Sequence, residues 1–340
     1  MNYASEVLRG NRLALARLLT QIENETPEGR AALAALYSHT GRAYRIGVTG
    51  APGTGKSSLV NQLALHYRRA PGGGQRVAVV AVDPSSPFTG GAILGDRVRM
   101  RDLSGDQGVF IRSMASRGSL GGLAAATSGV VQALDAAGFE VILVETVGAG
   151  QAEVDIARLA HTTLVIEAPG LGDDIQAIKA GILEIADVLV INKADRPGVE
   201  STERALRSML QLGHPTARVF QNHPRKPGHE VVEAPSAPPS TGEAPLWLPP
   251  ILRTVATEGQ GIAELAAAIE QHRQHLQASG ELEQRELARL RAELELLLRE
   301  TLVARWRART PDERFAQALE RIARRELSPW QAAEELAKEC

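Results

Sequence analysis

Residues 50–57 read Gly-Ala-Pro-Gly-Thr-Gly-Lys-Ser and match the pattern G-x-x-x-x-G-K-[ST] at every fixed position. A predicted strand, Arg45 to Thr49, precedes them, and a predicted helix, Ser58 to Arg68, follows. Glycines let backbone N–H groups converge on phosphate oxygens, and the start of the helix adds positive potential. Lys56 can reach the outer phosphates, and the Ser57 hydroxyl is placed for Mg²⁺. The pattern predicts nucleotide binding by Gly50, Ala51, Pro52, Gly53, Thr54, Gly55, Lys56, Ser57 and Ser58.

A second motif, Asn192-Lys193-Ala194-Asp195, directly follows the apolar run Val188 to Ile191 and has the form N-K-x-D. The Asp195 carboxylate can accept hydrogen bonds from N1–H and the 2-amino group of guanine. Adenine offers neither donor there, so the acid would lose its partners. Four residues alone also fit a surface turn, but the position downstream of a phosphate loop favours a guanine motif. With Asn192, Lys193 and Asp195, and with Ala256 and Thr257 closing the base pocket, the expected ligands are GTP and GDP.

Acidic residues stand at the ends of two other apolar runs. Asp83 follows Val77 to Val82, and Glu145 follows Val141 to Val144. Ligands of open α/β folds bind at this edge of the sheet, and Mg²⁺ takes oxygen ligands that include one or two carboxylates. Each acid taken singly fits an N-cap or a turn better. Together with Ser57, the acids predict a Mg²⁺ site formed by Ser57, Asp83, Asp96 and Glu145.

The segment Glu145-Thr146-Val147-Gly148 predicts a loop that senses the γ-phosphate through the Gly148 N–H group. Many GTPases carry a glutamine directly after this glycine to orient the attacking water, whereas this chain has Ala149. We therefore expect slow intrinsic hydrolysis, with Lys56, Glu145 and Gly148 as the catalytic residues. A partner protein or another side chain must then orient the water.

Alternating elements must position these motifs. Short apolar runs recur from Tyr44 onward, and most are separated by enough residues for a crossover helix. This rhythm is typical of βαβ units, so it predicts an α/β fold of the P-loop NTPase type, with a mostly parallel sheet buried on both faces. The expected strands centre on 46–48, 77–82, 109–111, 141–144, 164–166, 188–191 and 251–252.

Helical segments flank the predicted sheet. Residues 1–40 read as an N-terminal helical extension packed on the main domain, with Thr26-Pro27 starting a helix. Residues 41–275 form the nucleotide-binding domain, interrupted by a loop at 215–250 that holds nine of the 18 prolines. Leucines at three/four spacing in 276–340 predict a C-terminal helical arm that forms a homodimer, although packing on its own domain is also open.

Composition limits the remaining functions. The formal net charge is −2, and no basic block indicates nucleic-acid binding. Cys340 is the single cysteine, so disulfides within the chain and multi-cysteine metal sites are excluded. No apolar run approaches a membrane span, and we expect a cytoplasmic protein. His272 and His275 are expected on a solvated helix face, and Trp247 and Trp330 in packing contacts. Capping boxes are predicted at Thr310–Glu313 and Ser328–Gln331.

Three segments resemble the signature of one family, the methylmalonyl-CoA mutase-associated GTPases (MeaB/ArgK type). They are Val82 to Arg97, Arg117 to Leu123 and Glu145 to Gln151. The resemblance implies a G domain of the SIMIBI class, an N-terminal helical extension and a C-terminal dimerisation arm. It also implies a chaperone whose GTP binding and hydrolysis gate the loading of adenosylcobalamin into an acyl-CoA mutase such as methylmalonyl-CoA mutase. By position, 168–179 resembles the family's third switch, with Lys179 a candidate contact for the 145–151 loop.

Two other functions remain open from the sequence. The chain can be a kinase that passes the γ-phosphoryl group of a purine nucleotide to an acceptor, although no separate acceptor site is visible. It can also be a nucleotide-bound scaffold whose helical arm does the work while hydrolysis is idle. The 215–250 loop is longer than the family pattern suggests, which affects local structure and not nucleotide binding.

Overall fold

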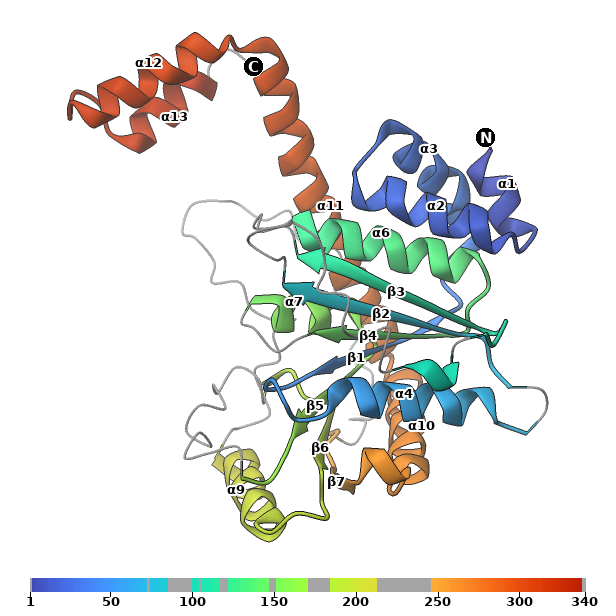
Figure 1. The fold of residues 1–340 in the computed structure, drawn as a ribbon. Coiled ribbons are helices and arrows are strands. Elements are labelled where there is room, and N and C mark those ends of the chain that lie inside the picture. The colour runs from blue at the N-terminus through green and yellow to red at the C-terminus, as the bar shows by residue number, and fades with distance from the viewer. Residues whose placement is uncertain are drawn as a thin grey trace. The chain divides into compact units, whose positions relative to one another are not determined.

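The computed structural model describes residues 2–71, 74–84, 100–103, 105–116, 122–146, 151–170, 184–212 and 246–337. Within them the chain divides into two compact units, Met1–Leu287 and Ala288–Cys340. The first unit contains a sheet with helices on both of its faces (Figure 1). The expected α/β architecture of a P-loop NTPase with helical extensions is confirmed.

The sheet has seven strands in the order β3-β2-β4-β1-β5-β6-β7, and all six pairs of neighbouring strands are parallel. The strands are apolar because parallel strands are covered on both faces. Their order places β1 at the centre, so the loop that follows it opens between β4 and β5. The bounds are β1 Tyr44–Thr49, β2 Val77–Pro84, β3 Val109–Ser116, β4 Val141–Thr146, β5 Thr162–Glu167, β6 Val188–Asn192 and β7 Ile251–Thr254.

Alternation along each strand builds two separate hydrophobic cores. In β4, Ile142 and Val144 belong to the core beneath α6 (Gly122–Ala136). Val141 and Leu143 belong to the core on the other face, beneath α4 (Lys56–Arg68) and α10 (Ile262–Ser279). Successive side chains of a strand point to opposite faces, so one short apolar strand serves both cores. Helices α7 (Gln151–Leu159) and α9 (Val199–Leu212) complete the crossovers described.

The N-terminal helices pack on α6, on the side away from the sheet (Figure 1). They are α1 (Tyr3–Leu8), α2 (Arg12–Glu23) and α3 (Pro27–Leu36). Arg12 donates to the backbone oxygens of Gln107 and Val109, both at 2.6 Å, and so holds the start of α2 against β3. Thr26 accepts a hydrogen bond from Gly29 N at 3.1 Å, which confirms the predicted helix start.

The C-terminal segment is helical, with α11 (Glu281–Arg309), α12 (Asp312–Ala323) and α13 (Pro329–Ala337). Helix α11 begins in the first unit and continues in the second. Ser328 and Gln331 exchange the two hydrogen bonds of the predicted capping box. The box predicted at Thr310 is wrong, because the cap position of α12 is Pro311 and no side chain caps this helix start. Thr310 N instead donates to Trp306 O at the end of α11.

Two expectations about single side chains are also wrong. His272 is fully buried and His275 largely so, because both lie against Trp247 and not against solvent. Trp330 is 73% exposed, with its indole nitrogen donating to Glu334, so it is not a packing residue within this chain. In the described part of the chain, no helix combines the length and apolarity that crossing a bilayer requires.

Candidate nucleotide-binding site

The phosphate loop connects the end of β1 at Thr49 with the start of α4 at Lys56. Its three glycines have positive φ angles, 137° at Gly50, 83° at Gly53 and 93° at Gly55. A Cβ atom on Gly50 would collide with the backbone oxygen of Ile166, and one on Gly55 with the side-chain amide of Asn192. Conformation and close approach thus both require glycine at these two positions.

Lys56 folds back over this loop. Its Nζ donates to the backbone oxygens of Gly50 at 2.8 Å and Ala51 at 2.9 Å, and the residue is 6% exposed. These carbonyls hold the ammonium group inside the loop whose N–H groups are expected to bind phosphate. A positive charge fixed at this point attracts the outer phosphates of a nucleotide.

Ser57 and Glu145 meet beside the phosphate loop. The Ser57 hydroxyl donates to Glu145 Oε1 at 2.7 Å, and Glu145 is buried. The contact follows from the sheet, because β4 pairs with β1 and places Glu145 opposite Val48. A serine hydroxyl and a carboxylate are oxygen ligands of the kind that Mg²⁺ prefers. The structure thus brings together two of the four residues expected at the metal site.

The other two expected ligands are not placed beside them by the described residues. Asp83 lies in β2, which pairs with β4 with Val82 opposite Thr146, but its side chain is outside the described part. Asp96 lies wholly outside it, as do Gly148, Ala149 and Lys179. The described residues alone contain no group of three His, Cys, Asp or Glu side chains able to hold a metal ion. The predicted four-residue Mg²⁺ site is therefore not tested by them.

The guanine motif is fastened directly to the phosphate loop. Asn192 Nδ2 donates to Thr54 O at 2.8 Å, and Lys193 Nζ donates to Gly53 O at 2.6 Å. Lys193 has a φ of 58°, which turns the chain sharply at the end of β6. Two motifs that lie far apart in the sequence thus form one rigid surface at the carboxyl edge of the sheet, where ligands of such folds bind.

A third segment, at the end of β7, contacts the guanine motif through the side-chain oxygen of Asn192. Asn192 Oδ1 accepts hydrogen bonds from Thr254 Oγ1 and from Ala256 N, both at 3.1 Å. Thr254 ends β7, and Ala256 begins the 3-10 turn η4 (Ala256–Glu258). Asp195 and Thr257, the two residues predicted to meet the base, are exposed. Sequence reasoning missed Thr254, although its position at the end of a predicted strand was a usable signal.

Comparison with known proteins identifies the family. Residues 15–311 match the family model described as "Methylmalonyl Co-A mutase-associated GTPase MeaB". A putative GTPase of Pyrococcus abyssi is 42% identical, over 97% of this chain and 94% of its own length. GTPase ArgK of Escherichia coli is 36% identical, over 81% of this chain and 76% of its own.

Two further relatives widen the comparison. The methylmalonic aciduria type A homolog of Caenorhabditis elegans, described as mitochondrial, is 30% identical over 82% of this chain and 67% of its own length. A crystal structure named as a LAO/AO transport system kinase has a TM-score of 0.66 and 28% identity, covering 99% of this chain and 95% of that one. The GTP-hydrolysing enzyme expected from the sequence is confirmed by these relatives. The chain belongs to the family of methylmalonyl-CoA mutase-associated GTPases.

Proposed function

We propose that this chain binds GTP and Mg²⁺ at the carboxyl edge of its sheet and hydrolyses the γ-phosphate as a chaperone of an adenosylcobalamin-dependent acyl-CoA mutase. One observation supports the proposal that the chain binds a nucleotide. Asn192 and Lys193 hold the guanine motif against Thr54 and Gly53 of the phosphate loop. A base bound by the first segment and phosphates bound by the second are then held in a fixed relation, as catalysis by positioning requires.

Base selection is assigned to Asp195. Its exposed carboxylate follows the fixed residue Asn192 by three positions and is free to meet a ligand from solvent. Guanine offers two donors to such a carboxylate and adenine offers none. The backbone of Ala256, held by Asn192 Oδ1, supports the same pocket.

The metal is assigned to Ser57 and Glu145, with Asp83 and Asp96 as the remaining candidates. The 2.7 Å contact between Ser57 Oγ and Glu145 Oε1 supports this, because it gathers two oxygen donors next to the loop. Bound there, Mg²⁺ supplies positive charge that stabilises the phosphate oxygens. Glu145 also precedes the segment that holds Gly148, the residue assigned to the γ-phosphate.

Hydrolysis is assigned to Lys56, whose ammonium group lies within the phosphate loop, and to the Glu145–Gly148 segment. Ala149 stands where many GTPases have their water-orienting glutamine. Because the chain lacks that glutamine at position 149, we expect slow turnover that a partner accelerates.

The mutase partner and the homodimer rest on the family and on the C-terminal helices. The family description names methylmalonyl-CoA mutase, and the nematode relative is named for methylmalonic aciduria. The second unit exposes large apolar side chains, a pattern expected of a surface that a second copy covers. They are Leu294, Leu298, Leu302, Phe315, Leu319 and Trp330. We assign residues 1–40 to an extension, 41–275 to the G domain and 276–340 to the dimerisation arm.

Mixing experiments test the partner. A methylmalonyl-CoA mutase from the same organism should raise the GTPase rate, and GTP should control transfer of adenosylcobalamin to it. Lys56→Ala is the matched control and should abolish both effects. No effect of any acyl-CoA mutase would refute the chaperone function. Mutase control that persists in Lys56→Ala would favour a scaffold, and labelled phosphate on an acceptor other than water would favour a kinase.

A further inference from the structure

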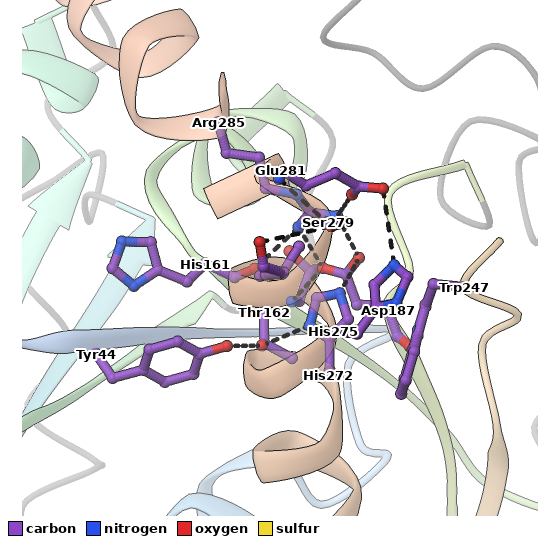
Figure 2. A network of polar contacts seen from close by, with 12 residues as sticks. Tyr44, His161, Thr162, Asp187, Trp247, His272, His275, Ser279, Glu281 and Arg285 are labelled. Atoms are coloured by element: carbon purple, nitrogen blue, oxygen red, sulfur yellow. Dashed lines mark hydrogen bonds and ion pairs between the residues drawn. The ribbon is translucent and has the colours of Figure 1, made fainter. Parts of the chain in front are cut away.

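A buried polar cluster, drawn in Figure 2, lies where strands β1, β5 and β6 begin. This amino edge of the sheet is opposite the edge that carries the phosphate loop. Tyr44 and Thr162 begin β1 and β5, and Asp187 directly precedes β6. His272 comes from α10, and Arg285 comes from the second turn of α11. Five segments of the chain therefore meet around one set of polar side chains.

Part of this cluster has the residue types of a hydrolase triad. Thr162 Oγ1 lies 2.8 Å from His272 Nδ1, and His272 Nε2 lies 3.2 Å from Asp187 Oδ1. The Tyr44 hydroxyl contacts Thr162 Oγ1 at 2.6 Å, and burial raises the pKa of Tyr44 to about 12. Thr162 and His272 are 0% exposed and Asp187 is 4% exposed. No substrate reaches a hydroxyl at this depth, so the cluster is not catalytic.

A buried ion pair in the cluster joins α11 to the sheet. Arg285 donates from Nη2 to Asp187 Oδ1 at 2.9 Å and from Nη1 to Asp187 Oδ2 at 3.0 Å, a two-pronged pair. Arg285 Nη1 also donates to His161 O at 2.8 Å, and the neighbouring Glu286 pairs with Arg45 of β1. The first two turns of α11 are thus fixed to the starts of β1, β5 and β6.

The Asp187 carboxylate stays ionised beside Arg285 although it is buried. Burial by itself would raise the pKa of Asp187, but the Arg285 guanidinium, together with His272, outweighs it and holds that pKa well below its usual range. Asp187 is thus ionised across the physiological pH range. A buried ion pair of this kind is costly to break from one side, because the remaining charge stays buried and unpaired.

Asp187 also fixes the start of β6. Its backbone N–H donates to Thr163 O at 2.9 Å, and its Oδ2 accepts from Thr163 N at 2.9 Å. Strand β6 then runs for only five residues to Asn192. Asn192 bonds Thr54 of the phosphate loop and Ala256 of the base pocket. One short strand is therefore held by α11 at its first end and holds the nucleotide site at its other end.

We propose that Asp187 and Arg285 are positioning residues that couple the start of α11 to the guanine motif through β6. A force that displaces the first turns of α11 acts on Asp187, shifts β6 and loosens the Asn192 contacts, so bound GDP leaves faster. By linkage, bound nucleotide must strengthen the attachment of α11 by the same factor by which that attachment raises the affinity for the nucleotide. The inference rests on the proposed guanine-nucleotide binding.

The test compares single and double variants of the full chain. Arg285→Met leaves the buried Asp187 without its guanidinium partner, and Asp187→Asn leaves the buried Arg285 without the carboxylate that faces it. The double variant Asp187→Asn/Arg285→Met buries neither charge, and its stability to urea should recover. Release of fluorescent GDP should be about 10-fold faster in all three. With unchanged association this is about a 10-fold loss of affinity, within the range typical of coupled sites. Arg285→Lys, which keeps the charge and loses the two-pronged geometry, should show a smaller acceleration.

Hydrogen exchange and one control complete the experiment. Amides of residues 281–287 should exchange more slowly with GDP bound in the wild-type chain, and this protection should disappear in the double variant. Arg291→Ala removes an exposed arginine of the same helix, paired with Glu295, and should leave GDP release unchanged. A double variant that releases GDP at the wild-type rate would overturn the coupling. A wild-type chain that does not bind GDP would overturn the proposed function and the coupling with it.

Discussion

The side-chain amide of Asn192 donates to the backbone oxygen of Thr54 at 2.8 Å, across a separation of 138 residues. Its oxygen accepts from Thr254 Oγ1 and Ala256 N, so one buried side chain joins the phosphate loop, the guanine motif and the turn after β7. The folded chain thus brings together the three segments of the proposed nucleotide site.

Replacing Asn192 by alanine should weaken GTP and GDP alike. The change leaves the Ala256 N–H and the Thr54 oxygen without their partner, at about 1–3 kcal/mol for each buried polar group. Affinity should fall by about 10- to 100-fold, which calorimetry measures. Asn11→Ala serves as control, because it removes the N-cap of α2 and about 1 kcal/mol of stability far from the site. Equal losses of affinity in both variants would contradict the role of Asn192.

Replacing Asp195 by asparagine should change base preference and leave phosphate binding intact. The amide no longer accepts both guanine donors, so GTP should bind more weakly by about 1–3 kcal/mol. XTP carries an oxygen in place of the 2-amino group and should bind the variant better than it binds the wild-type chain. Competition between the two nucleotides measures the preference, and an unchanged GTP-to-XTP ratio would refute the assignment.

Replacing Glu145 by glutamine should separate hydrolysis from binding. The variant keeps the size of the side chain and an oxygen that accepts from Ser57, but it loses the charge that Mg²⁺ favours. GDP affinity without Mg²⁺ should stay within about twofold of wild type, while the Mg²⁺ concentration required for hydrolysis rises. A Mg²⁺ titration of phosphate release measures this. Unchanged Mg²⁺ dependence would exclude Glu145 from the metal site.

The stability contributed by Asp187 should be independent of pH from about 5 to 8. Its folded-state pKa lies well below the unfolded value of about 3.9. A depressed pKa stabilises the fold above the unfolded value, and this stability is lost as the pH falls toward the folded value. Asp187→Asn should therefore cost about 3–5 kcal/mol at neutral pH.

Urea unfolding at each pH measures the loss of stability caused by Asp187→Asn. Both chains that are compared carry His272→Gln, so that titration of the imidazole does not contribute. The difference in unfolding free energy between chains with and without Asp187→Asn should be constant above pH 5 and should shrink below about pH 4. A difference that shrinks between pH 8 and pH 5 would show that the carboxylate takes up a proton there, contrary to the ion pair.

Much of the sheet could be predicted because its strands are buried on both faces. Each apolar run then stands out against the polar helices between the strands, and all seven predicted runs fall within β1 to β7. Strand β3 shows the limit of this signal. The predicted strand covers only 109–111, whereas the observed strand continues to Ser116. Arg112 and Ser113 still pair with β2 although their side chains are polar.

The histidine cluster could not be predicted for a different reason. His272 lies among Gln271, Arg273 and Gln274, a pattern typical of a solvated helix face. In the fold it contacts Thr162, which lies 110 residues earlier in the sequence, and Asp187. Only the folded sheet brings these two residues next to His272. Tertiary contacts of this range leave no periodic trace in the sequence.

Release of phosphate from γ-labelled GTP tests the central claim most directly, with the wild-type chain and Lys56→Ala compared at equal concentration. The wild-type chain should release labelled inorganic phosphate from GTP and not from ATP, with no label retained on protein. Lys56→Ala should lose about 100-fold of that rate, as expected when one preorganised charge is removed. Equal release from ATP, or full activity in Lys56→Ala, would contradict a GTPase built on residues 50–57 and 192–195.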